Sequence, residues 1–208
     1  MKRRFDDAYR EHVCLDDGTQ VLLRPVRRDD AALVLAGFNQ LSADSRYLRC
    51  MAATPQLSPA ATAYLTAVDG ENHFALGAVR EPDGREEPAG LAEFVRLADQ
   101  PDVAEIGIAI VDGLQGRGLG RELLERLIEA ARERGIHQVR FEVLSANSRM
   151  RNLLHDVVPD ASVRYDGPTF TAEVSLAAGP DGGGRHPVLH AALAAAADQP
   201  GTVARPKR

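Results

Sequence analysis

The sequence predicts an α/β fold in which helices cover both faces of a mixed β-sheet. Several short segments alternate apolar and polar residues, which is typical of strands. Other segments repeat apolar residues at the spacing of an amphipathic helix. The expected order is a strand, helices, three strands, a helix, a strand, a helix and two strands, which indicates a sheet of mixed direction. The 208 residues suffice for one domain with its own core.

The elements expected before residue 100 are an N-terminal extension, a strand, a helix, a turn or short helix, a further helix and two strands. In that order they span residues 1–20, 21–26, 31–41, 42–49, 58–68, 73–79 and 89–97. Ser58 is a strong N-cap and Pro59 suits the first helical turn, so together they mark a helix start. The segment EPDGREEP between the two strands is rich in turn formers and predicts a hairpin.

Strands and helices alternate in the second half of the chain. The expected strands span 103–111, 138–144, 161–166 and 169–176, and the expected helices span 118–134 and 147–156. The 118–134 helix has a continuous leucine-rich stripe and ends before Gly135, a good helix stop. After Leu176 the composition becomes rich in Gly, Pro and Ala, so we expect residues 177–208 to be a tail on a domain spanning 21–176.

Composition and charge argue against several classes of function. The net charge is −5 and no basic patch is evident, so a nucleic-acid partner is not expected. Neither a membrane-spanning segment nor a secretory signal is recognisable. Cys14 and Cys50 are far apart and form no CxxC pair, which argues against a metal site and fits a reducing cytoplasm.

The segment Gln115–Gly120 forms a glycine-rich turn between a strand and a helix. The first N–H groups of a helix lack partners within it, and the helix dipole adds positive charge there. Glycines allow close approach, so the turn suits a pyrophosphate, and Arg117 and Arg121 add charge. The P-loop and dinucleotide patterns both fail at position 121, which is neither lysine nor glycine. On spacing alone, a purely structural turn remains an alternative.

The strand, the QGRGLG turn and the following helix resemble motif A of the GCN5-related N-acetyltransferase (GNAT) superfamily, which binds the coenzyme A pyrophosphate. Residues 138–155 resemble the motif that follows, and the resemblance covers about 21–176. It implies the GNAT fold, a splayed strand pair at the acyl-CoA site, and acetyl-CoA as co-substrate. The residues it assigns to acetyl-CoA are Ile108, Ile110, Val111, Gln115, Gly116, Arg117, Gly118, Leu119, Gly120, Arg121 and Asn147.

The segments LSADSRYLR (41–49) and VDGENHFAL (68–76) resemble the acetyltransferase module of bacterial protein lysine acetyltransferases, although Cys50 stands where those proteins tend to carry Phe. This resemblance implies a protein lysine as acceptor, and Phe38 and Tyr47 are candidate acceptor-binding residues. A small amine is the alternative acceptor, and a noncatalytic acyl-CoA-binding module is the alternative from another class. A cytoplasmic monomer or homodimer is expected.

Amine attack on a thioester requires a base, because a lysine amine is mostly protonated at neutral pH. In the lysine acetyltransferases that the chain resembles, the glutamate matching Glu105 is the general base; a structural glutamate paired with an arginine is the alternative. The resemblance also implies that N–H groups near Ile110 and Val111 stabilise the oxyanion. Many members protonate the thiolate with a Tyr where this chain has Leu154, so the thiolate leaves unprotonated or takes a proton from water, Ser148 or His155.

Overall fold

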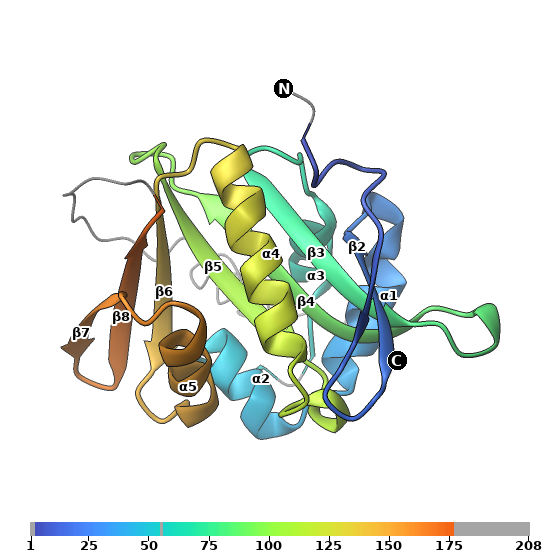
Figure 1. Ribbon diagram of the computed structural model, residues 1–208. Coiled ribbons are helices and arrows are strands. Elements are labelled where there is room, and N and C mark those ends of the chain that lie inside the picture. Colours follow the sequence, from blue (N-terminus) through green and yellow to red (C-terminus); the bar gives the residue numbers. More distant parts are fainter. Residues whose placement is uncertain (1–2, 55, 177–208) are drawn as a thin grey trace, which may run out of the picture.

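The computed structural model describes residues 3–54 and 56–176 (Figure 1). Within these residues eight strands form one sheet in the order β1-β2-β3-β4-β5-β6-β8-β7. They span Glu11–Cys14 (β1), Gln20–Pro25 (β2), His73–Arg80 (β3), Glu87–Arg96 (β4), Val103–Ile110 (β5), Gln138–Leu144 (β6), Ser162–Asp166 (β7) and Thr169–Ser175 (β8). Among the described strands β5 and β6 pair in parallel and the other neighbours pair antiparallel, so the predicted mixed sheet is confirmed.

Helices cover both faces of the sheet, as predicted (Figure 1). They span Ala31–Asn39 (α1), Ala43–Cys50 (α2), Pro59–Thr66 (α3), Leu119–Glu133 (α4) and Ser148–Val157 (α5), with short 3₁₀ turns at Arg28–Asp30, Pro82–Gly84 and Asp112–Leu114. α4 and α5 pack on one face, and α1, α2 and α3 pack on the other. The Ser58 hydroxyl accepts a hydrogen bond from the Ala61 amide at 3.1 Å, so the expected cap of α3 is present. The expected tail, 177–208, lies outside the described residues.

The sequence suggested that the domain starts at residue 21. In the structure the sheet already begins with β1, within residues 1–20. β1 pairs with β2, and the Phe5 side chain is fully buried in the main core. The mostly polar composition of residues 1–20 hides this arrangement, because the few apolar side chains that reach the core are dispersed among charged ones. They are Phe5, Tyr9, Val13 and Leu15.

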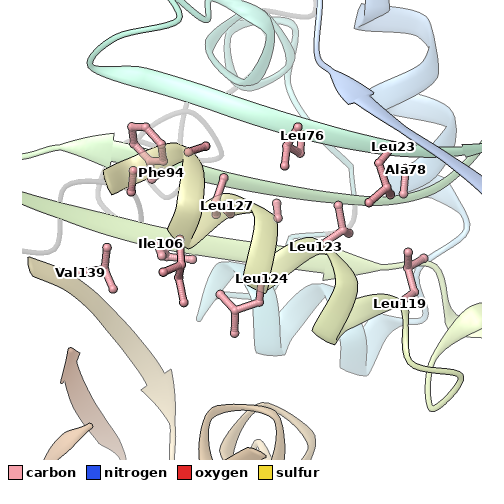
Figure 2. Packing of buried hydrophobic residues seen from close by; sticks show 14 of the residues in the cluster. Leu23, Leu76, Ala78, Phe94, Ile106, Leu119, Leu123, Leu124, Leu127 and Val139 are labelled. Carbon is pink, nitrogen blue, oxygen red and sulfur yellow. The ribbon is translucent and has the colours of Figure 1, made fainter. Parts of the chain in front are cut away.

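The main core lies between α4 and the sheet. Leu119, Leu123, Leu124 and Leu127 recur at helical spacing and point from α4 toward the strands, as Figure 2 shows. They meet side chains of the central strands, such as Leu76, Phe94 and Ile106. This packing fixes the N-terminus of α4 against the end of β5, where the glycine-rich turn lies.

Replacing Leu124 with alanine is expected to lower the free energy of unfolding by about 2–5 kcal/mol, because it leaves a cavity in a close-packed core. Leu124 has 0% of its surface exposed. Urea denaturation measures the change. The control is Leu35→Ala on α1, where the side chain is 37% exposed and the expected loss is within about 0.5 kcal/mol. Equal losses for the two variants would contradict the packing described.

The Glu11 carboxylate ties β1 to α4. It accepts hydrogen bonds from Arg126 at 2.7 Å, from Arg4 at 3.0 Å and from the Tyr9 hydroxyl. The bond from Arg126 is the largest cause that lowers the pKa of Glu11, which falls from 4.5 to about 2. The charged form is therefore more stable in the folded state than in the unfolded chain.

The contribution of Glu11 to stability is expected to depend on acid pH. It is fully present above about pH 4.5, and it is lost as pH falls toward 2 and the folded-state carboxylate is protonated. Thermal unfolding between pH 7 and pH 2 should therefore show Glu11→Gln less stable than the parent near neutrality, with the difference shrinking below pH 4.5. Glu129→Gln, at a half-exposed partner of Arg4, is the control and should show little difference. A Glu11→Gln difference that stays constant across this range would argue against the assigned pairing.

Candidate active site

The sheet opens between β5 and β6. Among the described residues these strands pair only where Val103–Glu105 lies beside Gln138–Arg140. Beyond this point they diverge (Figure 1), while β4 stays paired with β5 as far as Ile110. A cavity of about 480 Å³ occupies the opening, bounded by the two strands, the 114–120 turn, α2 and α5. The predicted splayed strand pair is therefore present.

Most of the residues predicted to bind acetyl-CoA line this cavity. They are Ile108, Ile110, Gln115, Gly116, Gly118, Gly120, Arg121 and Asn147. Val111, Arg117 and Leu119 are not among the described residues that line it. Leu119 is 1% exposed and packs into the main core, so its side chain anchors the glycine-rich turn to the core and does not face the cavity.

The backbone of β5 has hydrogen-bonding groups that face the opening. The Val111 amide donates to the Ala89 carbonyl at 3.0 Å, which makes Ile110 and Gly90 a non-hydrogen-bonded pair. The Ile110 amide and carbonyl therefore point away from β4, toward the side that β6 has left. The Gln115 side-chain amide donates to this carbonyl at 3.0 Å. The Ile110 amide is therefore a hydrogen-bond donor that faces the cavity, whereas the Val111 amide already donates to the Ala89 carbonyl of β4.

The glycine-rich turn has the geometry expected of an anion site. Gly118, the N-cap of α4, has φ 88°, and Gly116 has φ 71°. These are left-handed conformations that glycine adopts without strain. The helix begins its hydrogen bonding when the Arg121 amide donates to Gly118 at 2.9 Å. The amides of residues 119 and 120 precede this donor and have no acceptor within the helix.

Close approach to this turn depends on the absence of side chains. A Cβ on Gly120 would lie 3.3 Å from Leu153, and one on Gly118 would lie 3.1 Å from the Asp16 carboxylate. The glycines therefore leave the helix N-terminus accessible, and a pyrophosphate fits the donors that are present. Arg121 and Arg149 are cations that line the cavity; the Arg121 side chain is 46% exposed and lies 3.5 Å from the Asp156 carboxylate.

Arg117 has a different environment from the one expected. Its guanidinium forms an ion pair with Asp17, and its carbonyl accepts a hydrogen bond from the Asp16 amide at 3.1 Å. Both aspartates belong to the turn between β1 and β2. Arg117 therefore connects the N-terminal hairpin to the phosphate turn. Sequence analysis missed this contact because the partners are 100 residues apart.

Glu105 is fully buried on the face of the sheet covered by α1, α2 and α3. Among the described residues it is not one that lines the cavity. Gly107 and Ala109, the next residues on the same face of β5, do line it. Since a strand rises about 3.3 Å per residue, Glu105 lies roughly 7 Å beyond Gly107. Glu105 therefore lies at the end of the opening where β5 and β6 are still paired, one residue before Ile106, which lines the cavity.

A buried polar cluster lies on the same face of the sheet as Glu105. The Glu93 carboxylate has 0% of its side chain exposed, lies 2.8 Å from His73 Nε2 and accepts a hydrogen bond from Arg49 at 2.7 Å. Burial, with the charges of Glu93 and Glu105, raises the pKa of Tyr64 to about 12. Neither His73 nor Glu93 is among the site residues that the sequence predicts. Glu93 follows the strand alternation, but nothing in its local sequence distinguishes it from an exposed strand residue.

Glu142 is a carboxylate in the cavity that sequence analysis missed. It follows Arg140, the last β6 residue paired with β5, and it faces the opening. Burial raises the pKa of Glu142, and the nearby Arg140 opposes this shift. The only signal in the sequence was a charged residue within the alternating strand QVRFEVL.

The other candidate residues lie in distinct environments. Phe38 is buried in a small core beneath α1, whereas Tyr47 is 49% exposed. Leu154 is 4% exposed and packs into the main core, so it has no role in proton transfer. The His155 side chain is 84% exposed. The Asn147 side chain caps α5 by accepting a hydrogen bond from the Met150 amide at 3.0 Å, and it also lines the cavity.

The family model of the acetyltransferase (GNAT) domain matches residues 20–157, which include the opening and the turn. The chain belongs to the GNAT acetyltransferase family. An acetyltransferase of Pseudomonas aeruginosa is 32% identical over 139 residues, 67% of this chain and 74% of that relative. Acetyltransferase Pat of Mycolicibacterium smegmatis is 31% identical over 166 residues, which are 76% of this chain but 46% of Pat. The chain thus spans less than half of that second relative.

A solved GNAT structure has the same architecture. The GNAT domain of S. lividans PAT matches with a TM-score of 0.73 and 29% identity, over 80% of this chain and 96% of that one. The sequence-based assignment to the GNAT fold is therefore confirmed, and the protein is an acyl-CoA N-acyltransferase. Within the described part of this GNAT enzyme, no helix has both the length and the apolar character that crossing a bilayer requires.

Proposed function

We propose that this GNAT enzyme transfers an acetyl group from acetyl-CoA to an amine, and that the acceptor is a protein lysine. The observation that carries the proposal is the 480 Å³ cavity between the diverging strands, which joins the glycine-rich turn to the open edge of β5. One end of this cavity suits a pyrophosphate, and its middle offers backbone groups suited to an amide-containing arm. These are the chemical features of coenzyme A.

The residues proposed to bind the diphosphate are those of the turn. The N–H groups of residues 119 and 120 would donate to it, Arg121 would add a positive charge, and Gly116 and Gly118 keep the approach open. Ile108 and Ile110 lie on the open edge of β5, where their backbone groups suit the pantetheine amides. The thioester supplies an activated acyl group, and the Ile110 amide is suited to stabilise the oxyanion that forms on amine attack.

We propose Glu105 as the general base, acting through a water molecule. Burial removes the carboxylate from bulk solvent, and Gly107, the next residue on the same face of β5, has no side chain and lines the cavity. The amine then attacks directly, without a covalent enzyme intermediate. Glu142 is the competing candidate because it lines the cavity itself. Leu154, which cannot donate a proton, stands where many members of the family carry a tyrosine, and a thiol pKa of about 8.5 lets the thiolate leave unassisted.

The proposal of a protein acceptor is supported by the resemblance of residues 41–49 and 68–76 to the acetyltransferase module of bacterial protein lysine acetyltransferases. An acceptor screen tests it, with acetyl-CoA as donor and release of the free thiol as the readout. The panel holds purified acyl-CoA ligases, polyamines and amino acids. We expect release with a protein and acetylation of a lysine by mass spectrometry. Release only with small amines would assign a small acceptor, and binding without any release would indicate a noncatalytic acyl-CoA-binding protein.

A further inference from the structure

A second cavity of about 80 Å³ lies beneath α1, next to the first. Its walls come from α1, from α3 and from the strands β3, β4 and β5, and they are largely apolar. Residues that define its shape include Val34, Phe38, Leu65, Gly77, Leu91 and Ala109. Protein interiors are normally close-packed, so an apolar space of this size next to a substrate cavity requires an explanation.

The second cavity adjoins the first at the acyl end of the proposed coenzyme A site. Leu41, Arg49 and Ala109 line both cavities. Ala109 lies between Ile108 and Ile110, the residues on the open edge of β5. An acyl chain whose thioester lies at this edge would therefore pass over the short side chain of Ala109 to reach the second cavity.

Small residues create the space. Gly77 and Ala109 line the cavity in strands where larger side chains would fill it. A Cβ on Gly77 would lie 3.5 Å from Val26, which is ordinary contact, so the backbone does not require glycine there. A water-sized group needs about 10–15 Å³ of cavity volume, so a cavity of about 80 Å³ holds roughly five to eight of them.

We propose that this second cavity binds the hydrocarbon part of acyl groups longer than acetyl, so that the enzyme uses straight-chain acyl-CoA thioesters of about four to six carbons. This inference rests on the proposed function, since it names the donor class of the same site. The apolar walls favour a saturated chain. Arg49 at the junction is already paired with Glu93, so a chain with a terminal carboxylate is disfavoured.

The test uses the full chain with acetyl-, butanoyl-, hexanoyl- and succinyl-CoA and one accepted amine. Calorimetry without acceptor measures Kd, and thiol release measures kcat/KM. Burial of one methylene group lowers Kd by about fourfold, so burial of even one of the four additional carbons should make hexanoyl-CoA bind at least about threefold more tightly than acetyl-CoA. We also expect kcat/KM for butanoyl- and hexanoyl-CoA to be within about tenfold of the acetyl value.

Variants that fill the cavity test the assigned location. Val34→Phe should lower kcat/KM for hexanoyl-CoA about tenfold or more and weaken its binding, while acetyl-CoA values change by less than about twofold. Leu35→Phe on the exposed side of α1 is the matched control. If Val34→Phe fails to fold, Gly77→Ala fills part of the same space with an ordinary contact.

Three results would overturn the inference. Turnover of acetyl-CoA with rejection of butanoyl- and hexanoyl-CoA would refute it while leaving the proposed acetyl transfer intact. A preference for succinyl- over butanoyl-CoA would show that the junction binds a carboxylate. Equal losses for acetyl and hexanoyl donors in a folded Val34→Phe or Gly77→Ala variant would place the chain elsewhere. Failure of every thioester to bind or react would instead reject the proposed function itself.

Discussion

Glu105→Gln is expected to lower kcat by about 100-fold to 10,000-fold, the range typical of losing a general base. Glutamine has nearly the same shape but cannot take a proton at neutral pH. The Kd of acetyl-CoA should change by less than about twofold, because Glu105 lies beyond the cavity that binds it. Steady-state rates and calorimetry on the same preparation separate the two effects.

Glu142→Gln is the matched comparison, since Glu142 is the carboxylate that lines the cavity. If Glu105 is the base, Glu142→Gln should retain kcat within about tenfold. If the large loss occurs in Glu142→Gln and Glu105→Gln stays active, Glu142 is the base. The acidic limb of the pH–rate profile should then reflect the raised pKa of Glu142 and disappear in its glutamine variant.

Stability must be checked for both variants, because a buried carboxylate also has a structural role. Glu105 is 0% exposed and lies beside Arg140 in the parallel pair of strands. A lower unfolding temperature with an unchanged rate per folded molecule would assign Glu105 to structure alone. This outcome would support the alternative of a glutamate paired with an arginine.

The fold and the phosphate turn could be predicted from sequence because local rules specify them. The helix at Pro59–Thr66 follows from a serine cap and a proline, and α4 follows from its leucine stripe. The turn Gln115–Gly120 was identifiable because left-handed backbone at a helix N-terminus requires glycine. In each case the determining residues are close together in sequence.

Features that depend on distant residues were not predictable in the same way. The pairing of Arg117 with Asp17 requires β1 to join the sheet, and the polar sequence before residue 21 conceals this. The position of Glu142 in the cavity depends on where β6 separates from β5. The two cavities likewise result from helices and strands that meet only in the folded state.

Replacing Gly118 with alanine is expected to raise the Kd of acetyl-CoA by about 100-fold. Gly118 has φ 88°, and a left-handed residue with a side chain is strained by about 1–2 kcal/mol. The new Cβ would also lie 3.1 Å from the Asp16 carboxylate. Relief of these strains rotates the turn and misaligns the amides of residues 119 and 120. Loss of one charge-assisted hydrogen bond costs about 1.5–3 kcal/mol, and the upper part of this range corresponds to the 100-fold rise in Kd.

The appropriate control is Gly113→Ala, in the short 3₁₀ turn just before the glycine-rich segment. A Cβ there meets nothing within 4 Å, and it should leave the Kd within about twofold of the parent. Calorimetry gives both values, and kcat at saturating acetyl-CoA should stay nearly unchanged in Gly118→Ala because the reacting groups are untouched. Normal binding by a folded Gly118→Ala variant would show that the N-terminus of α4 does not hold the diphosphate. The turn would then be structural, and the coenzyme A site would have to be sought along the open edge of β5 alone.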